Sequence, residues 1–347
     1  MKIAIVTDTH FGARNDSSHF DAYFRKFYDE VFFPYLEEHG IKTLFHGGDV
    51  FERRKYINFN TLRSCKDYFF RRLVELGIDM YVIPGNHDTY YKNTNEINSI
   101  DLLLREYPNI HVIQEPKKMM FENREFTFIP WLCPDNYDAS LKAISEPGDV
   151  CVGHFEIDGF DMFRGARNDG GLDRKILSHY SLVLSGHFHH RSTDDNIYYL
   201  GSPYGMTWSD YDDPRGFHIF DTKTSDLTFI QNPFEIFHKV YYDDRNPTID
   251  ASQFKKACVK LIVAHKTDYT RFDKLIDALY INEVIELTIH EDFSEFESEA
   301  LDEENLNIED TMTLLTDYVD SVESAKDKER LKTLLKTLYI EAQHLEL

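Results

Sequence analysis

The sequence predicts an α/β fold in which two mixed β-sheets pack together and helices flank them. Over residues 2–113, short apolar runs alternate with helical stretches, which indicates βαβ units and a largely parallel sheet. From about residue 118 to residue 231, short apolar or alternating runs dominate and indicate a second sheet. Beyond residue 235 the pattern is that of a small α+β unit followed by C-terminal helices. The 347 residues, 42% of them apolar, can bury a large core.

The individual elements follow from these runs in chain order. Strands are expected at 3–6, 43–45 and 81–83, and helices at about 17–39, 60–76 and 96–105. In the second part, strands are expected at 126–129, 150–152, 182–184, 197–200, 217–220 and 227–230. The small unit is expected to contain strands at 236–242 and 284–289, and helices at about 251–265 and 273–279.

Composition divides the chain into three parts. The Gln-Asn-Pro segment at 231–233 marks a boundary, so we predict a main domain at 1–234 and a small α+β capping domain at 235–300. Residues 291–320 contain twelve acidic residues and no Lys or Arg, and apolar residues then recur at helical spacing. We therefore predict an acidic linker and a helical tail at 301–347. This tail either packs on its own domain or docks a partner.

Charge and cysteine content narrow the class of protein. The chain has 38 basic and 61 acidic residues, and its net charge of −23 argues against tight binding of a polyanion by charge alone. It has no run of about 18 apolar residues, so no membrane span is expected. The four cysteines are far apart and form no Cys-x-x-Cys pair, which fits a reducing, intracellular setting.

Asp, Asn and His side chains follow five of the predicted strands. In chain order they are Asp8 and His10; Asp49; Asn86, His87 and Asp88; His154; and His187 and His189. Open α/β sheets place their sites at the carboxyl ends of strands, which is where these residues stand. Any one of these motifs alone is more often a turn or a satisfied polar pair. Turns and polar pairs do not explain five such motifs in this order.

The spacing and chemistry of these residues indicate a metal centre. In extended backbone, residues two apart point to the same face, so Asp8 with His10, and His187 with His189, can each converge on one ion. The donors are imidazole, carboxylate and amide groups without a thiolate, which favours Mn²⁺, Fe²⁺ or Zn²⁺ over a structural zinc site. Seven donors suit two ions that share a carboxylate, roughly 3.5–4 Å apart. His46 and His190 match no motif and are expected to face solvent or support the ligands.

The five motifs resemble the signature of the calcineurin-like metallophosphoesterase superfamily, D-x-H, G-D, G-N-H-[DE], G-H and G-H-x-H, over roughly residues 1–220. The resemblance implies an α/β/β/α sandwich that hydrolyses phosphoesters. It implies one metal site formed by Asp8, His10, Asp49 and His189, and a second formed by Asp49, Asn86, His154 and His187. It also implies that His87 faces the scissile phosphate and assists the leaving oxygen, with Asp88 placed to orient it.

Residues 201–203, 208–210 and 215–217 resemble a block of the SbcD-type DNA double-strand-break repair nucleases, G-S-P, S-F-x-E and K-G-F. Where that block has Glu and Lys, this chain has Asp210 and Arg215. Residues 47–51 also match the second motif of that branch, and the length, small domain and tail are similar to those of its phage members.

This resemblance implies a DNA exonuclease or endonuclease that acts in double-strand-break processing and recombination, with Mn²⁺ as its first and Mg²⁺ as its second choice of metal. It implies a homodimer and an SbcC-like, coiled-coil ABC-type ATPase that binds the C-terminal helices. The location implied is the cytoplasm, that of the infected host for a phage-encoded protein. Several relatives carry His where this chain has Glu52, so the exonuclease role of that His does not carry over. The basic segment Arg53, Arg54 and Lys55 is the candidate DNA contact.

Two other classes of function stay open on the sequence alone, because the motifs determine the reaction and not the substrate. One is a phosphomonoesterase, or a phosphodiesterase that acts on something other than nucleic acid. The other is a scaffold without activity that docks a partner through its tail. Because the charge is acidic, a nuclease of this kind is expected to bind DNA weakly without its partner.

Overall fold

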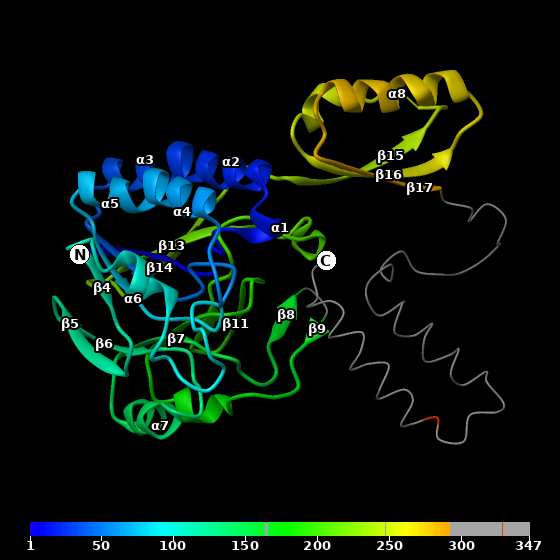
Figure 1. Ribbon diagram of the computed structural model, residues 1–347. Coiled ribbons are helices and arrows are strands. Elements are labelled where there is room, and N and C mark those ends of the chain that lie inside the picture. Colours follow the sequence, from blue (N-terminus) through cyan, green and yellow to red (C-terminus); the bar gives the residue numbers. More distant parts are fainter. Residues whose placement is uncertain (164–165, 247, 292–327, 329–347) are drawn as a thin grey trace. The chain divides into compact units, whose positions relative to one another are not determined.

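Two six-stranded mixed β-sheets form the centre of the fold (Figure 1). The computed structural model describes residues 1–163, 166–246, 248–291 and 328. Residues Met1–His290 form one compact unit. The predicted linker and tail at 301–347 lie outside the described residues, except for Lys328. No helix in the described part of the chain is long and apolar enough to cross a membrane.

The first sheet has the strand order β14-β13-β1-β2-β3-β4. Its parallel strands are β1 (Lys2–Val6), β2 (Thr43–His46), β3 (Asp79–Val82) and β4 (Ile110–Val112). Antiparallel strands complete it, β13 (Gly216–Asp221) beside β1 and β14 (Leu227–Gln231) at the edge. The sequence assigned these last two strands to the second sheet, and the structure places them in the first. The period of a strand predicts which face is buried but not which neighbour it pairs with.

The second sheet has the order β11-β12-β10-β7-β6-β5. Its strands are β5 (Lys117–Phe121), β6 (Arg124–Ile129), β7 (Val150–His154), β10 (Leu182–Gly186), β11 (Ser192–Asp194) and β12 (Ile197–Tyr199). Strands β6, β7, β10 and β12 run parallel to one another, whereas β5 and β11 are antiparallel edges. A short pair, β8 (Asp161–Phe163) and β9 (Ala166–Arg167), lies in the connection from β7 to β10.

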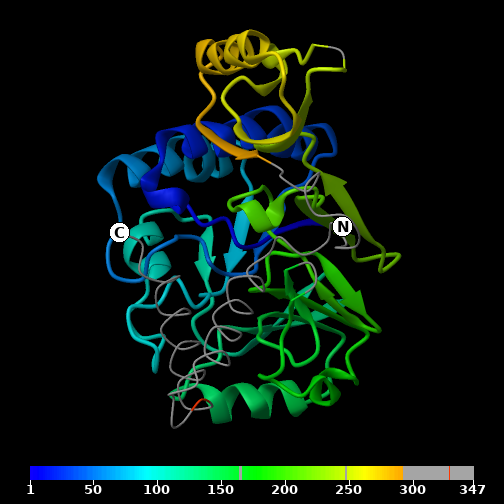
Figure 2. The ribbon, with the colours of Figure 1, turned by 90° about the vertical axis from the view of Figure 1, so that its right-hand side faces the viewer.

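Helices cover the outer faces of both sheets. Over the first sheet lie α1 (Ala13–Asp16), α2 (Ser18–Phe27), α3 (Phe33–Glu38), α4 (Phe59–Cys65), α5 (Arg71–Glu75) and α6 (Ser99–Leu104). Helix α7 (Tyr137–Ser145), which the sequence did not predict, lies below the second sheet in Figure 1 and again in Figure 2. The four layers confirm the predicted sandwich of two mixed sheets between helices.

The long helices of the first layer contain π-helical turns. Residues Tyr28–Phe32 join α2 to α3, and Lys66–Phe70 join α4 to α5, so the predicted helices at 17–39 and 60–76 are present. The aromatic residues of these turns pack against each other, with the Tyr28 and Phe69 ring centroids 4.8 Å apart. The third helix begins at Ser99, later than expected, because the Asn98 side chain caps it by accepting a hydrogen bond from the Asp101 N–H.

Alternation along β1 explains how one strand serves two cores. Ile3 and Ile5 point toward the second sheet, where they join a core with residues of β6, β7 and β10. Ala4 and Val6 point the other way and join the aromatic core under the helices. All four are buried. A strand with both faces covered reads as a continuous apolar run, which is the pattern that the sequence shows.

The small unit after residue 235 has its own three-stranded sheet and core. Its elements are β15 (Phe237–Asp243), β16 (Cys258–His265), α8 (Tyr269–Ile281) and β17 (Glu286–Glu291). The helix expected at 251–265 was wrong: a short 3₁₀ turn, Ala251–Phe254, precedes strand β16. Cys258–His265 is rich in valine and isoleucine and pairs in parallel with β15, which favours the extended form. The boundaries at 234/235 and 300/301 stay predictions.

Candidate metal centre

The seven predicted metal ligands lie together at one end of the two sheets. Asp8 and His10 follow β1, Asp49 follows β2 and Asn86 follows β3, and these three strands are parallel neighbours. In the second sheet His154 ends β7, while His187 and His189 follow its parallel neighbour β10. Because parallel strands bring their carboxyl ends to the same edge, residues far apart in the sequence meet here.

The first donor group consists of Asp8, His10 and His189, with Asp49 at its border. The Nε2 atoms of His10 and His189 face each other at 3.0 Å. His10 Nε2 also lies 3.9 Å from Asp8 Oδ1 and 3.7 Å from Asp49 Oδ2. One donor atom each from Asp8, His10 and His189 lies within 4.8 Å of the others.

The second donor group consists of Asp49, Asn86, His154 and His187. Asn86 Oδ1 lies 3.0 Å from His154 Nε2 and 2.9 Å from His187 Nδ1. Asp49 Oδ2 lies 3.3 Å from His154 Nε2. The same carboxylate oxygen therefore faces His10 in the first group and His154 in the second, so Asp49 stands between the two groups.

The spacing of these donor atoms fits divalent metal ions. Two ligands about 2.1 Å from one ion and at a right angle lie about 3 Å apart, close to the contacts of 2.9 and 3.0 Å in both groups. The donors are oxygen and imidazole nitrogen only, a mixture that suits Mn²⁺ and similar ions.

The electrostatics of the two donor groups also favour a bound cation. Burial lowers the pKa of His10, but the carboxylates of Glu52, Asp49 and Asp8 raise it more, to about 10. Burial likewise lowers the pKa of His154, and Asp49 and Asp8 raise it to about 9. The carboxylates of both groups therefore favour a positive charge beside them, which a divalent cation would supply.

Four of the seven donors stand on strained backbone. Asp8, His10, Asp49 and His187 have φ values of 51°, 41°, 52° and 91°, in the left-handed region that L-residues seldom adopt. Each such residue costs about 1–3 kcal/mol. Backbone hydrogen bonds hold the turns in place, from Asp8 N–H to the Gly48 carbonyl at 3.0 Å and from His10 N–H to the Asp49 carbonyl at 3.1 Å.

Two glycines allow the loops that carry these donors to pack closely. Gly48 itself has a φ of 99°, and a Cβ there would lie 2.7 Å from His154 Nδ1. A Cβ on Gly85 would collide with both the carboxylate and the backbone nitrogen of Asp49. Any side chain at either position would push the second and third motifs apart.

The candidate catalytic residue His87 is held by a partner that the sequence did not predict. Its Nδ1 lies 2.6 Å from the backbone carbonyl of Glu52. Since a carbonyl only accepts, Nδ1 carries the proton and Nε2 is left for other contacts. Asp88, expected to orient His87, instead accepts hydrogen bonds from the backbone N–H groups of Val50, Phe51 and Gly85. These contacts tie the second and third motif loops together, so that expectation is corrected.

Glu52 also contacts a metal-ligand candidate. Its Oε2 lies 2.8 Å from His10 Nδ1, the ring nitrogen that points away from the donor group. The His10 side chain is 2% exposed and that of Glu52 is 24% exposed. Glu52 thus holds His10 with its side chain and His87 with its carbonyl. The only sequence signal was its place three residues after Asp49.

The three basic residues after Glu52 have different surroundings. Arg53 forms an ion pair with Asp16 and its guanidinium lies 5.0 Å from the Tyr56 ring centroid. Arg54 lies over the Trp131 ring at 5.2 Å, and its buried Nη1 has no hydrogen-bond partner among the described residues. Lys55 is exposed.

The two extra histidines both lie next to the motif loops. His46 is 1% exposed, so it does not face solvent. Its Nε2 lies 3.1 Å from Thr9 Oγ1, and its Nδ1 accepts a hydrogen bond from Gly48 N–H. His190 Nδ1 lies 2.9 Å from Asp213 Oδ2. Each therefore supports a loop that carries candidate ligands.

Two mixed sheets between helices, with these donors at one edge, define a phosphoesterase of the calcineurin type. The sequence model of that family, calcineurin-like phosphoesterase, matches residues 1–203, and the chain belongs to this family. Exonuclease subunit 1 of Enterobacteria phage T4 is 31% identical to it over 353 residues, which cover 99% of each chain.

The chain also matches two solved structures at low identity, a phosphodiesterase and a nuclease. An archaeal phosphodiesterase, 13% identical, covers 67% of this chain and 100% of its own, with a TM-score of 0.32. The nuclease MPE of Pseudomonas putida, 16% identical, covers 62% of this chain and 83% of its own, with a TM-score of 0.30. At TM-scores of this size, neither structure bears on function.

Proposed function

We propose that this chain is a metal-dependent DNA nuclease that hydrolyses phosphodiesters with two divalent ions, Mn²⁺ in first place and Mg²⁺ in second. The observation that carries the proposal is the pair of donor groups that share Asp49 beside His87. The whole-length relative from phage T4, whose name is that of an exonuclease subunit, supports a nucleic-acid substrate.

In this proposal the chain's own residues hold the ions and position the substrate. Asp8, His10, Asp49 and His189 hold one ion, and Asp49, Asn86, His154 and His187 hold the other. When bound, the ions polarise the phosphoryl oxygens and neutralise the charge that develops on them.

His87 is the proposed acid. In its doubly protonated form the ring donates Nδ1–H to the Glu52 carbonyl, and Nε2–H transfers its proton to the leaving oxygen. Asp88 acts on this reaction through the loops that it holds together, not through contact with the His87 ring.

Among the three basic residues, Arg54 is the proposed phosphate contact. Arg53 is already paired with Asp16, whereas Arg54 Nη1 has no partner in the described structure and the ring of Trp131 supports its guanidinium. A guanidinium stacked on an aromatic ring holds a planar fork of N–H donors, and this fork matches the oxygens of a phosphate. Lys55, which is exposed, adds a second positive charge at the same loop.

The substrate class is tested by cleavage assays with the full chain. End-labelled duplex and single-stranded DNA are incubated with Mn²⁺ or Mg²⁺, in parallel with a chromogenic bis-ester and the matching monoester. We expect DNA and the bis-ester to be cleaved in Mn²⁺. Preference for the monoester, with DNA left intact, would identify a phosphomonoesterase and contradict the proposal.

We further propose that an SbcC-like ABC-type ATPase is the partner, that the pair acts in double-strand-break processing and recombination, and that the tail at 301–347 docks it. The acidic net charge supports this, because a chain of charge −23 gains little affinity for DNA on its own. Deletion of residues 305–347 is expected to abolish capture of the ATPase in a pull-down and to leave bis-ester hydrolysis intact. Capture by the shortened chain would refute the docking role.

A homodimer is proposed from an exposed apolar cluster. Tyr56, Ile97 and Leu102 line one groove, and their side chains are 63%, 42% and 68% exposed. Such a cluster on a protein of this size marks a contact surface. Leu102→Glu is expected to convert a dimer to a monomer in sedimentation velocity. Met120→Glu, at a side chain that is 61% exposed and outside this groove, is the control of equal charge. An unchanged sedimentation coefficient for Leu102→Glu would exclude this surface.

The domain boundaries belong to the same proposal, with a nuclease domain at 1–234, a capping domain at 235–300 and a docking segment at 301–347. The cytoplasm of an infected bacterial cell is the proposed location. The relative that matches over the whole chain is a phage protein, which supports this location.

A further inference from the structure

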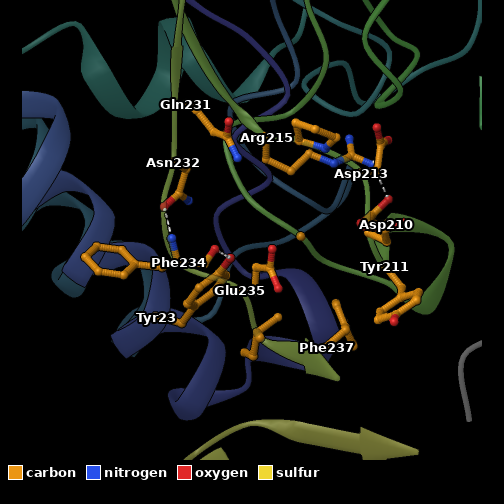
Figure 3. A pocket seen from close by; sticks show the side chains of 14 residues that line it. Tyr23, Asp210, Tyr211, Asp213, Arg215, Gln231, Asn232, Phe234, Glu235 and Phe237 are labelled. Atoms are coloured by element: carbon orange, nitrogen blue, oxygen red, sulfur yellow. Dashed lines mark hydrogen bonds and ion pairs between the residues drawn. The ribbon is translucent and has the colours of Figure 1, made fainter. Parts of the chain in front are cut away.

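A buried ion-pair cluster lies behind the candidate ligand His189. Arg215 Nη2 lies 2.8 Å from Asp210 Oδ1 and 2.7 Å from Asp213 Oδ2. The exposed fractions of these three side chains are 6%, 2% and 4%. Figure 3 shows the guanidinium group of Arg215 between the carboxylates of Asp210 and Asp213. A buried charge is tolerated only with partners of this kind.

The other terminal nitrogen of Arg215 reaches the metal-centre loop. Nη1 donates to the backbone carbonyl of His189 and, at 2.9 Å, to the hydroxyl of Ser202. The Ser202 N–H donates to the same His189 carbonyl at 3.1 Å. The backbone carbonyl of His189 therefore accepts two hydrogen bonds. The imidazole of the same residue places its Nε2 3.0 Å from His10 Nε2.

The next residue is held by the same cluster. His190 Nδ1 lies 2.9 Å from Asp213 Oδ2, the oxygen that also contacts Arg215. Asp210 is in turn anchored, because its Oδ2 accepts hydrogen bonds from the backbone N–H groups of Met206 and Thr207. The Arg215 guanidinium thus links the anchored carboxylate of Asp210 to His189 directly and to His190 through Asp213.

The cluster contains both positions at which this chain departs from the family block. Asp210 and Arg215 are the positions where the resembling sequences carry Glu and Lys, and here they contact each other. The acid is shorter by one methylene group and the base is longer, so the two changes offset each other in reach. The fork of Arg215 lets one nitrogen bind the carboxylates while the other binds the carbonyl, which a single ammonium group does less well.

We propose that Arg215, fixed by Asp210 and Asp213, is a positioning residue that sets His189 for one of the two metal ions. This inference rests on the metal centre of the proposed function. Groups behind a metal ligand fix its orientation, and their loss lowers metal affinity about 10–100-fold. Since His189 belongs to the group of Asp8 and His10, the loss is selective for that ion.

Calorimetric titration of Mn²⁺ into the metal-stripped full chain tests the proposal. Arg215→Lys is expected to weaken one of the two ions at least about tenfold and to leave the other unchanged. The double variant Asp210→Glu/Arg215→Lys, which restores the family pair, is expected to recover most of that affinity. Arg105→Lys, at a side chain that is 76% exposed and paired within its own helix, is the matched control.

A second variant guards against loss of folding. Asp213→Asn keeps the Asp210–Arg215 pair and is expected to weaken the same ion by a smaller factor. Thermal unfolding in EDTA is recorded for every variant. Folded Arg215→Lys or Asp213→Asn with wild-type affinity for both ions overturns the proposal, as does equal weakening of both ions. A wild-type chain that binds no Mn²⁺ would instead overturn the metal centre itself, and this inference with it.

Discussion

Replacement of Glu52 by Gln tests whether a group outside the metal ligands determines metal affinity. The substitution keeps the size of the side chain and the backbone carbonyl that holds His87. It removes only the negative charge 2.8 Å from His10 Nδ1. A carboxylate behind a metal-binding imidazole raises its basicity and fixes the ring, so this charge is expected to matter even though it does not touch the ion.

The size of the effect follows from the surroundings of the pair. His10 is almost fully buried and Glu52 is three-quarters buried, so solvent screens the contact little. Loss of a group that supports a metal ligand costs about 1.4–2.8 kcal/mol of metal binding. With 1.4 kcal/mol per factor of ten, the expected loss of Mn²⁺ affinity is about 10–100-fold. The loss is expected at the ion that Asp8, His10 and His189 are proposed to hold.

The assay is the titration of Mn²⁺ into metal-stripped chain, with the metal dependence of DNA cleavage beside it. Glu96→Gln is the matched control, because it removes the same charge from an exposed position. We expect the cleavage curve of Glu52→Gln to shift to higher Mn²⁺ and to reach a similar plateau. If both ions bind Glu52→Gln as tightly as the wild type, Glu52 does not support His10 and the reasoning fails.

Three more predictions concern other parts of the chain. His87→Ala is expected to lower kcat on DNA by about 10²–10⁴ while both Mn²⁺ ions still bind; wild-type turnover would remove His87 from the reaction. Arg54→Gln is expected to weaken DNA binding for all sequences alike and to reduce the salt dependence of binding by about one charge. Lys223→Gln, at an exposed and distant position, should do neither. Equal effects of the two substitutions on DNA binding would exclude a phosphate contact by Arg54. Backbone hydrogen bonds, led by that from Asp268 N–H, hold the pKa of Asp244 well below its ordinary 3.8. The Asp244 carboxylate therefore stabilises the small unit above that pH and loses this effect as the pH falls. The Asp244→Asn variant should unfold more readily than the wild type at pH 7, and as readily as the wild type in acid. A difference in denaturant stability that does not change with pH would contradict this.

The sequence predicted the parts of the fold that short segments determine. Apolar runs such as Ile3–Val6 are buried on both faces, and the polar residues that follow them could be located without any knowledge of pairing. Strand Cys258–His265 was mistaken for a helix because an apolar run of that length fits both forms until a neighbour is known. Its parallel partner, Phe237–Asp243, supplies that information only in three dimensions.

The candidate site shows the same division. The ligand candidates could be predicted because they stand at the carboxyl ends of five strands. The partners of those residues could not, because they come from other loops. Asp88 was expected beside the His87 ring, yet unpaired N–H groups of the neighbouring loop needed an acceptor and Asp88 supplies it. Glu52 became a partner of His10 only through the crossing of two loops.

The left-handed backbone at Asp8, His10, Asp49 and His187 has a consequence for how this protein tolerates mutation. Glycine at any of these positions would relax the turn and also delete a donor atom. Selection for yield of folded protein and selection for cleavage therefore favour opposite residues at the same four sites. A variant library screened only for solubility is expected to lose its metal ligands first, and the resulting proteins would be well folded and inactive.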